Sequence, residues 1–426
     1  MDLLIKKGRI IDPSSKLDKI ADILIEDGTI KAIEENIPKK DISVWDANGK
    51  LVLPAFVDLH CHLREPGQEH KETLTSGAMA GVAGGFCTLF AMPNTSPPLD
   101  DKTRISYVLK KSEDLPLYVF PIGALTQGMK EEQLSPIAEL AEAGAKALSD
   151  DGHPIQNSNL LRNALLYAKM FKLPVMLHCE DISLSRGGVA NEGYTSTRLG
   201  LRGIPKSAEE VGVARAIILA LETGSRVHIC HISTKRSLEL VKWGKEKGAP
   251  ITCEVTPHHL ILTDEAIEGY NTRAKCNPPL RTEEDRIALI EGLLDGTIDC
   301  IATDHAPHSP DEWDVEFDLA PFGIAGLETS FPILYTHLVE PGFIPLELLV
   351  DKMSTSPAKL MGLEQGKIEV GKEANLTIID TEVKEVRTVN LFSKGKNNPF
   401  VGWKLKGFPC LTICKGKIVF ERREFL

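Results

Sequence analysis

The sequence predicts an α/β fold, in which a (β/α)8 TIM-like barrel carries a small β-sandwich domain built from both ends of the chain. Through the middle of the chain, runs typical of buried strands alternate with segments of helical length, which is the pattern of a parallel sheet covered by helices. Both ends instead show short strand-like runs broken by turns, with Asp27-Gly28 and Lys415-Gly416 at hairpin positions. The length of 426 residues suits a barrel with one small attached domain.

The expected barrel has eight strands. They cover residues 55–63, 86–94, 117–125, 145–151, 174–180, 226–233, 250–257 and 299–305. Helical segments connect them, and those at 207–224 and 235–248 end at a glycine that can cap a helix. We therefore expect residues 1–52 and 364–426 to form the small β domain and residues 53–363 to form the catalytic barrel.

Composition and charge favour a globular protein that acts on a small molecule. The chain is 42% hydrophobic and 26% charged, and its formal net charge of −11 argues against nucleic acids and anionic membranes, which select basic surfaces. No apolar run approaches the roughly 20 residues that cross a bilayer, and the first residues lack the apolar core of a signal peptide. Nine cysteines without a CxxC pair suit a reducing compartment, so we expect a cytoplasmic protein.

His60 and His62 are the first candidates for catalytic chemistry. They stand two positions apart in a strand-like run, so both side chains point to one side and can share a metal ion. An isolated His-x-His pair is weak evidence, because solvated or structurally satisfied histidines are commoner than ligands.

Similar residues recur where other expected strands end, namely at His178, His231, Asp151 and Asp304. In a barrel these ends meet on one face, where active sites of this fold are assembled. Imidazoles and carboxylates gathered away from water need a compensating charge, which a cation supplies. Six ligands exceed what a single zinc ion usually takes, whereas two metals that share a carboxylate would use them all. One metal is assigned to His60, His62 and Asp304, the other to His178 and His231, and the bridge to Asp151.

The motifs around these residues resemble those of the amidohydrolase superfamily, and the finer pattern is similar to dihydroorotases of the bacterial class I type. The motifs are DLHCHLREPG (58–67), AMPNT (91–95), SDDG (149–152), HCED (178–181), HIST (231–234), NPPLR (277–281), ATDHAPH (302–308) and APFGIAGLET (320–329). HxH and TDHAP mark the superfamily, whereas HLREPG, MPNT and APFGI in this order are much narrower signals. The resemblance covers nearly the whole chain.

This resemblance implies the reversible cyclisation of N-carbamoyl-L-aspartate to L-dihydroorotate with loss of water, the third step of de novo pyrimidine biosynthesis. It implies two Zn²⁺ ions per subunit, bridged by Asp151 and a hydroxide. The hydroxide is the expected nucleophile in the hydrolytic direction, because metal cations lower the pKa of bound water. Asp304 is expected to accept the proton of the attacking water and to return it to the departing ring nitrogen.

Substrate recognition in an acidic protein requires a fork-shaped donor for the carboxylate. Arg64 fits, because it lies two residues past His62 and on the same side if the strand continues. The resemblance also assigns substrate contacts to His62, Asn94, Asn277, His308 and the backbone of Phe322 and Gly323. The acidic segment 309–321 is expected to be either a flap over the site or an ordinary surface loop.

The identity of the metal bridge has two alternatives. Many members of the superfamily use a carboxylated lysine, and Lys146 lies on the fourth expected strand. It stands five residues before Asp151 with the opposite strand parity, which favours Asp151. Asp150 is the local competitor, because parity cannot decide between neighbours in a turn.

Two other functions compete with this interpretation. A hydantoinase, dihydropyrimidinase or allantoinase would share the barrel and metals, but its ring has no carboxylate and does not require Arg64 with Asn94. An inactive homologue that scaffolds aspartate carbamoyltransferase would have lost ligands, and all six are present. We expect a homo-oligomer with a small-molecule substrate, for which association with aspartate carbamoyltransferase is compatible with activity.

Overall fold

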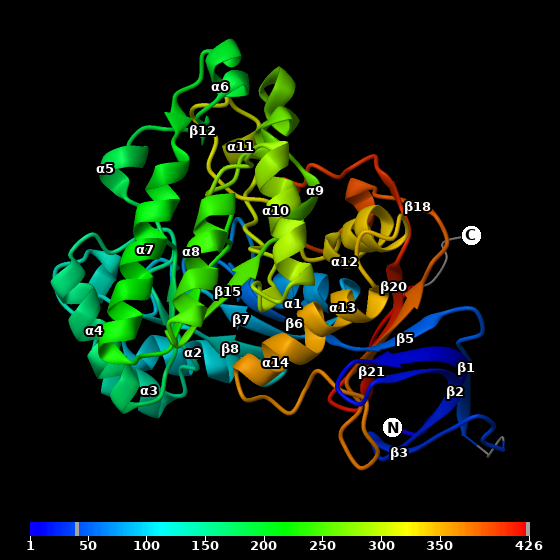
Figure 1. Cartoon of the computed structure of the whole chain (residues 1–426). Coiled ribbons are helices and arrows are strands. Elements are labelled where there is room, and N and C mark those ends of the chain that lie inside the picture. The colour runs from blue at the N-terminus through cyan, green and yellow to red at the C-terminus, as the bar shows by residue number, and fades with distance from the viewer. Residues whose placement is uncertain (39–41, 423–426) are drawn as a thin grey trace.

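The computed structural model describes residues 1–38 and 42–422. It confirms the predicted fold class, a barrel of parallel strands wrapped by helices beside a small β domain (Figure 1). Strands from the two ends of the chain, blue and red in Figure 1, belong to one sheet in that small domain. None of the described helices is long and apolar enough to cross a bilayer.

The barrel strands follow one another in the sheet as they do along the chain. They are β6 (Phe56–Cys61), β7 (Phe86–Ala91), β8 (Tyr118–Pro121), β9 (Gly123–Ala124), β10 (Leu148–Ser149), β11 (Val175–Leu177), β14 (Val227–Ile229), β15 (Ile251–Val255) and β16 (Cys300–Ile301). Only Ile122 separates β8 from β9, so these two pieces act as one strand between β7 and β10. A parallel bridge between Cys61 and His305 closes the ring. The eight predicted strands are therefore all present.

Burial on both faces explains why these runs are so apolar. Every residue of β6 is buried, and so is every residue of β7. A strand between a packed barrel interior and an outer layer of helices has no solvated face, so it cannot alternate polar and apolar residues. The polar residues that do occur there, such as Asp58 and His60, therefore need specific partners.

Helices cover the outside of the barrel. The larger ones are α1 (Leu74–Ala83), α2 (Lys102–Ser112), α3 (Ile137–Ala143), α4 (Ser158–Met170), α7 (Lys206–Thr223), α8 (Lys235–Glu246) and α10 (Glu283–Leu294). The Thr234 hydroxyl caps α8 by accepting from Ser237 N at 3.1 Å. Gly224, with φ +62°, ends α7 in the left-handed conformation that the sequence predicts for a glycine cap.

Shorter elements occur at the carboxyl ends of the strands and after the last strand. At the rim lie η1 (Gln127–Met129), α5 (Ile182–Ser185), β12 (Ala190–Asn191), α6 (Tyr194–Leu199), β13 (Gly203–Ile204), α9 (Pro257–Ile261), η2 (Asp264–Tyr270), η3 (Thr272–Ala274) and α11 (Pro310–Trp313). After β16 follow α12 (Ser330–Leu334), η4 (Tyr335–Val339), α13 (Leu346–Val350), η5 (Asp351–Thr355) and α14 (Ser356–Leu360). Of these, η4 and η5 are π-helical turns.

The small domain is one eight-stranded sheet that takes strands from both chain ends. Its strands are β1 (Leu3–Asp12), β2 (Leu17–Glu26), β3 (Thr29–Glu34), β4 (Ser43–Asp46), β5 (Leu51–Pro54), β17 (Leu376–Asp380), β20 (Phe408–Cys414) and β21 (Lys417–Glu421). The ends meet where β5 pairs with β17, for example Val52 with Ile378. Ile5, Ile23 and Ile413 belong to its own hydrophobic core.

Between β17 and β20 the chain leaves this sheet and crosses to the barrel. It forms β18 (Lys384–Glu385), η6 (Thr388–Asn390) and β19 (Lys404–Leu405). The connecting segment 391–400 contacts the loops that follow β16 through Asn397 and Asn398. The C-terminal part of the chain therefore reaches the face of the barrel on which the predicted ligands lie.

Candidate active site

The six predicted metal ligands meet at the carboxyl ends of the barrel strands. Each lies on a barrel strand or shortly after it: His60 and His62 at β6, Asp151 at β10, His178 at β11, His231 at β14 and Asp304 at β16. None of the six is more than 7% exposed. Ionisable groups buried together at this density need a shared partner charge.

His60, His62 and Asp304 gather on one side of Asp151. His62 Nε2 lies 3.1 Å from Asp304 Oδ1 and 3.4 Å from Asp151 Oδ2. His60 Nε2 lies 3.4 Å and 3.5 Å from the same two oxygens. These four atoms therefore face a common point.

His178 and His231 gather on the other side of Asp151. His231 Nε2 lies 3.4 Å from Asp151 Oδ1, and His178 Nδ1 lies 3.8 Å from the same oxygen. The two ring nitrogens are 3.0 Å apart. Asp151 thus turns one carboxylate oxygen toward each pair of histidines, which is the arrangement of a bridging ligand.

The residues present fit two metal ions. Tetrahedral ligands with bonds of about 2.0–2.1 Å stand roughly 3.3 Å from one another, close to the separations in both groups. His60 Nε2 and Asp151 Oδ1 are buried without any hydrogen-bond partner, a costly state that a cation would relieve. Imidazole and carboxylate donors are those that divalent zinc and similar transition metals take.

Two glutamates that sequence reasoning missed orient the histidines. His60 Nδ1 lies 2.6 Å from Glu254 Oε1, and His228 Nε2 lies 3.0 Å from Glu254 Oε2. His178 Nε2 lies 2.7 Å from Glu180 Oε2. A carboxylate on one ring nitrogen selects the tautomer whose other nitrogen is free for a metal. In the sequence, Glu254 is marked only as a charged residue within the otherwise apolar strand ITCEV.

The histidines around Glu254 determine its ionisation. Burial alone would raise the pKa of this carboxyl, but the imidazoles of His60 and His228 outweigh burial and lower its pKa to about 2. Glu254 is therefore an anion at neutral pH and accepts from both rings.

Three non-glycine residues of the site have left-handed backbone conformations. Their φ values are +62° for Arg64, +34° for His231 and +46° for Asp304. Non-glycine residues with positive φ are uncommon and cluster where function requires a particular side-chain direction. Each of these residues comes shortly after a barrel strand has ended.

The parity argument for Arg64 was wrong, although Arg64 does lie at the site. β6 ends at Cys61, so no strand continues to Arg64. The guanidinium is nevertheless buried, its Nε donates to Pro307 O at 3.2 Å, and its Nη2 lies 3.3 Å from His308 Nε2. Burial and the charge of Arg64 lower the pKa of His308 to about 3, so this imidazole is neutral.

Asn94 and Asn277 both contact the shell of the metal ligands. Asn94 Oδ1 lies 2.8 Å from His62 Nδ1. Asn277 Nδ2 donates to Glu180 Oε2 at 3.0 Å and lies 3.4 Å from His178 Nε2. The two asparagines predicted to bind substrate therefore each contact a histidine, one in each group of predicted ligands.

The backbone groups of Phe322 and Gly323 are engaged within the protein. His308 Nε2 lies 2.9 Å from Phe322 O, and Gly323 N donates to Lys275 O at 2.9 Å. Gly323 has φ +149°, and a Cβ there would lie 2.6 Å from Ala306 O, so this position requires glycine.

The segment 309–321 is tied to the barrel and contains the short helix α11. Lys275 Nζ donates to Phe317 O at 2.7 Å and to Ala320 O at 2.6 Å. The Trp313 ring is buried beneath the Arg273 guanidinium, whose carbon lies 4.6 Å from the ring centroid. The segment therefore has anchors at both of its ends.

The two competitors of Asp151 lie elsewhere. Lys146 is exposed, with Nζ 5.6 Å from the centroid of the Phe120 ring. Asp150 accepts from Leu125 N at 2.7 Å and from Thr126 N at 3.1 Å, which commits its carboxylate to the neighbouring strand. Neither side chain faces the histidines.

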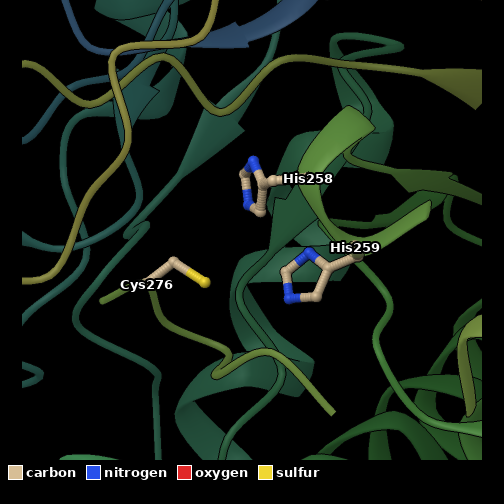
Figure 2. Close-up of side chains that lie close together, drawn as sticks. All are labelled: His258, His259 and Cys276. Carbon is tan, nitrogen blue, oxygen red and sulfur yellow. The ribbon is translucent and has the colours of Figure 1, made fainter. Parts of the chain in front are cut away.

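A second group of ligand-type side chains lies near the same rim. His258, His259 and Cys276 have ligand atoms within 4.8 Å of one another and point toward a common space (Figure 2). His259 Nδ1 lies 2.7 Å from the Thr256 hydroxyl, and His259 Nε2 lies 3.0 Å from Pro278 O, so both ring nitrogens are occupied. Burial raises the pKa of the Cys276 thiol, which keeps it protonated. His258 alone of the three offers a free ring nitrogen, its buried Nε2, so the group has fewer available ligand atoms than Asp151 and its histidines.

Comparison with known proteins gives matches over the whole chain. A family model described as Dihydro-orotase-like matches residues 49–237, and one described as Amidohydrolase family matches residues 335–420. The chain is 49% identical over 426 residues to a protein named Dihydroorotase from Acetivibrio thermocellus, covering 100% of both chains. It is 51% identical over 425 residues to the Dihydroorotase of a Thermoanaerobacter species, covering 99% of this chain and 98% of that one.

Solved structures with the same fold include cyclic amide hydrolases. L-Hydantoinase (dihydropyrimidinase) from Arthrobacter aurescens has a TM-score of 0.89 and 26% identity, covering 100% of this chain and 97% of that chain. D-Hydantoinase (dihydropyrimidinase) from a Thermus species has a TM-score of 0.83 and 27% identity, covering 100% and 96%.

Proposed function

Because this chain belongs to the dihydroorotase family of the amidohydrolases, we propose that it interconverts N-carbamoyl-L-aspartate and L-dihydroorotate at a site with two metal ions. It is a cyclic amide hydrolase of pyrimidine biosynthesis. The observation that supports the two-metal site best is Asp151, whose carboxylate oxygens face two separate pairs of histidines.

We assign the metals as two Zn²⁺ ions per subunit. His60, His62 and Asp304 would hold one, His178 and His231 the other, and Asp151 both. Cations bound there would lower the pKa of a coordinated water and polarise an amide carbonyl.

Asp304 is the proposed general base and acid. Its Oδ1 lies within 3.4 Å of both His60 Nε2 and His62 Nε2, so the carboxylate stands beside the atoms that would hold the first metal. Burial would raise the pKa of Asp304, but the neighbouring imidazoles outweigh it and lower the pKa, so the carboxylate is ionised at neutral pH. In hydrolysis it takes the proton of the attacking water and returns it to the departing ring nitrogen, and cyclisation reverses these steps.

Substrate binding is assigned to the residues around the metals. Arg64 supplies a buried guanidinium for the carboxylate, with His308 directly beside it, and Asn94 lies against His62. His62 would also contact the carboxylate. Asn277 and the backbone of Phe322 and Gly323 are the proposed contacts to the ring, which requires that the substrate share or replace the hydrogen bonds they make within the protein.

A hydantoinase-type activity is the second candidate, because the solved structures above share the fold and the barrel. Arg64 favours dihydroorotate: an unneutralised guanidinium buried at the rim is costly, and a substrate carboxylate would compensate it. The cytoplasmic location, the homo-oligomer and the association with aspartate carbamoyltransferase remain predictions, of which the first is supported by nine buried, unpaired cysteines.

The test is turnover by purified protein loaded with zinc. L-Dihydroorotate should be hydrolysed and N-carbamoyl-L-aspartate cyclised, with hydantoin, dihydrouracil and allantoin as poor substrates. Cyclisation removes one carboxylate and consumes a proton, so its equilibrium yield should rise as pH falls. A preference for hydantoin or allantoin would overturn the proposed substrate.

A further inference from the structure

We propose that Asn397 is a positioning residue. It holds residues 305–308 and residues 322–324 together, beside the residues proposed to bind the substrate carboxylate. Asn397 belongs to the segment 391–400, which the C-terminal part of the chain sends across to the barrel, and it is 1% exposed. The inference rests on the proposed function, specifically on the roles of Arg64 and His308.

The side-chain amide of Asn397 is fully used. Its Nδ2 donates to Ala306 O and to Gly323 O, both at 2.9 Å. Its Oδ1 accepts from His308 N at 2.9 Å. An asparagine side chain offers the two N–H donors and the oxygen acceptor that these three bonds require. An aspartate would instead place a carboxylate oxygen against two carbonyl oxygens.

The loops need this link because their own pairing stops early. His305 forms a bridge with Ile324, and Ala306 N donates to Ile324 O at 2.9 Å. Beyond that point Ala306 O and His308 N have no partner in the other loop, and Asn397 bonds both, as a neighbouring strand would.

The segment can approach closely enough because residue 395 is glycine. A Cβ on Gly395 would lie 2.4 Å from Pro307 Cβ, which no side chain could tolerate without a shift. The backbone of the segment 391–400 therefore lies directly against the loop that carries His308.

Asn397 holds the backbone that anchors Arg64 and His308, the two residues proposed to bind the substrate carboxylate. Arg64 Nε donates to Pro307 O at 3.2 Å, and His308 Nε2 lies 2.9 Å from Phe322 O. If the stretch around Pro307 shifts, both the guanidinium and the imidazole lose an anchor. A displacement of about 1 Å at a binding group can cost on the order of 100-fold in an enzyme's efficiency.

Asp304, the proposed general base and acid, is held independently of Asn397. His62 N donates to His305 O at 2.8 Å, and Thr303 N donates to the Asp58 side chain at 2.9 Å, so bonds to residues on and just after β6 fix the chain on both sides of Asp304. Loss of Asn397 should therefore weaken substrate binding more than the chemical step.

The experiment measures KM, kcat and zinc content for Asn397→Ala, with L-dihydroorotate as substrate. KM should rise at least about tenfold, while kcat stays within about threefold and the zinc content is unchanged. Asn397→Asp keeps the volume and the acceptor for His308 N but loses both donors, so it should raise KM as well. In a His308→Ala background, Asn397→Ala should raise KM by a smaller factor than it does alone, because Asn397 then acts only through the Pro307 carbonyl that anchors Arg64.

Asn398→Ala is the matched control. Asn398 is also 1% exposed, and its Nδ2 donates to Ala325 O at 2.8 Å and to Thr329 Oγ1 at 3.0 Å, but it makes no bond to the stretch 306–308. Its loss should lower the melting temperature similarly and leave KM within about twofold. If Asn397→Ala raises KM no more than Asn398→Ala does, or lowers kcat alone, the inference is wrong. A wild-type protein without dihydroorotate turnover would overturn the proposed function first, and the inference with it.

Discussion

Replacing Glu254 by glutamine should weaken the binding of the first metal while leaving the fold intact. The carboxylate accepts from His60 Nδ1 at 2.6 Å and from His228 Nε2 at 3.0 Å. A glutamine has the same shape but only one oxygen, so it can accept from one ring and must present an N–H to the other.

The two histidines differ in how they tolerate this change. His228 can exchange tautomers, because its Nδ1 faces the Thr252 hydroxyl at 2.7 Å and a hydroxyl can donate or accept. His60 cannot, because a proton on Nε2 would occupy the lone pair that faces Asp151 and Asp304. The glutamine oxygen can therefore stay with His60, but the ring loses the negative charge that raises its basicity as a metal ligand. Mutation of such an outer partner typically costs about 10- to 100-fold in metal affinity, or roughly 1.4–2.7 kcal/mol.

The assay is a competitive zinc titration against a chromophoric chelator, with circular dichroism as the check on folding. Glu328→Gln is the control, because Glu328 is also a buried carboxyl group, and it accepts from Phe392 N and Ser393 N, away from the proposed metal ligands. The control should bind both zinc ions as the wild type does. A folded Glu254→Gln protein whose zinc affinity lies within about threefold of wild type would refute the argument.

Three further predictions concern the proton shuttle, the rejected bridge and pH. Asp304→Asn, assayed at full zinc occupancy, should lower kcat by at least about 100-fold, and near-normal turnover would refute its role as base and acid. Lys146→Met should leave zinc content and kcat largely unchanged, and loss of both would reinstate the lysine as the bridge. Burial raises the pKa of Glu328 from its ordinary value of 4.5 to about 7, so its contribution to stability is present below pH 4.5 and is lost as pH rises through 7. The melting temperature should therefore fall more between pH 5 and pH 8 in the wild type than in Glu328→Gln. Equal falls in the two proteins would contradict the raised pKa of Glu328.

Strand periodicity predicted the barrel and the place where the candidate ligands gather, because both depend on local rules. Side chains two residues apart on a strand share a face, which placed His60 and His62 together before any contact was known. The ends of parallel strands meet at one rim, which added His178 and His231 from distant parts of the chain.

The same rule did not hold once a strand had ended. It assumed an extended chain at Arg64, where φ is +62°, and it could not separate Asp150 from Asp151, which lie in a turn after a two-residue strand. In both cases the direction of the side chain is set by tertiary hydrogen bonds rather than by the strand period.

Partners that join distant segments left little local trace. Glu254 contacts a histidine 194 positions away, and Asn397 contacts a loop that is 91 positions away at Ala306. An asparagine in a polar loop is ordinary in sequence, and only the three-dimensional arrangement shows that it closes a gap between two active-site loops.

Zinc stoichiometry in relation to activity tests the two-metal site most directly. Protein stripped with a chelator and titrated with zinc should regain L-dihydroorotate hydrolysis only as occupancy approaches two ions per chain. Asp151→Asn should reach a lower occupancy with little turnover, since its carboxylate faces both pairs of histidines. Full activity with one ion per chain, or with none, would contradict the account.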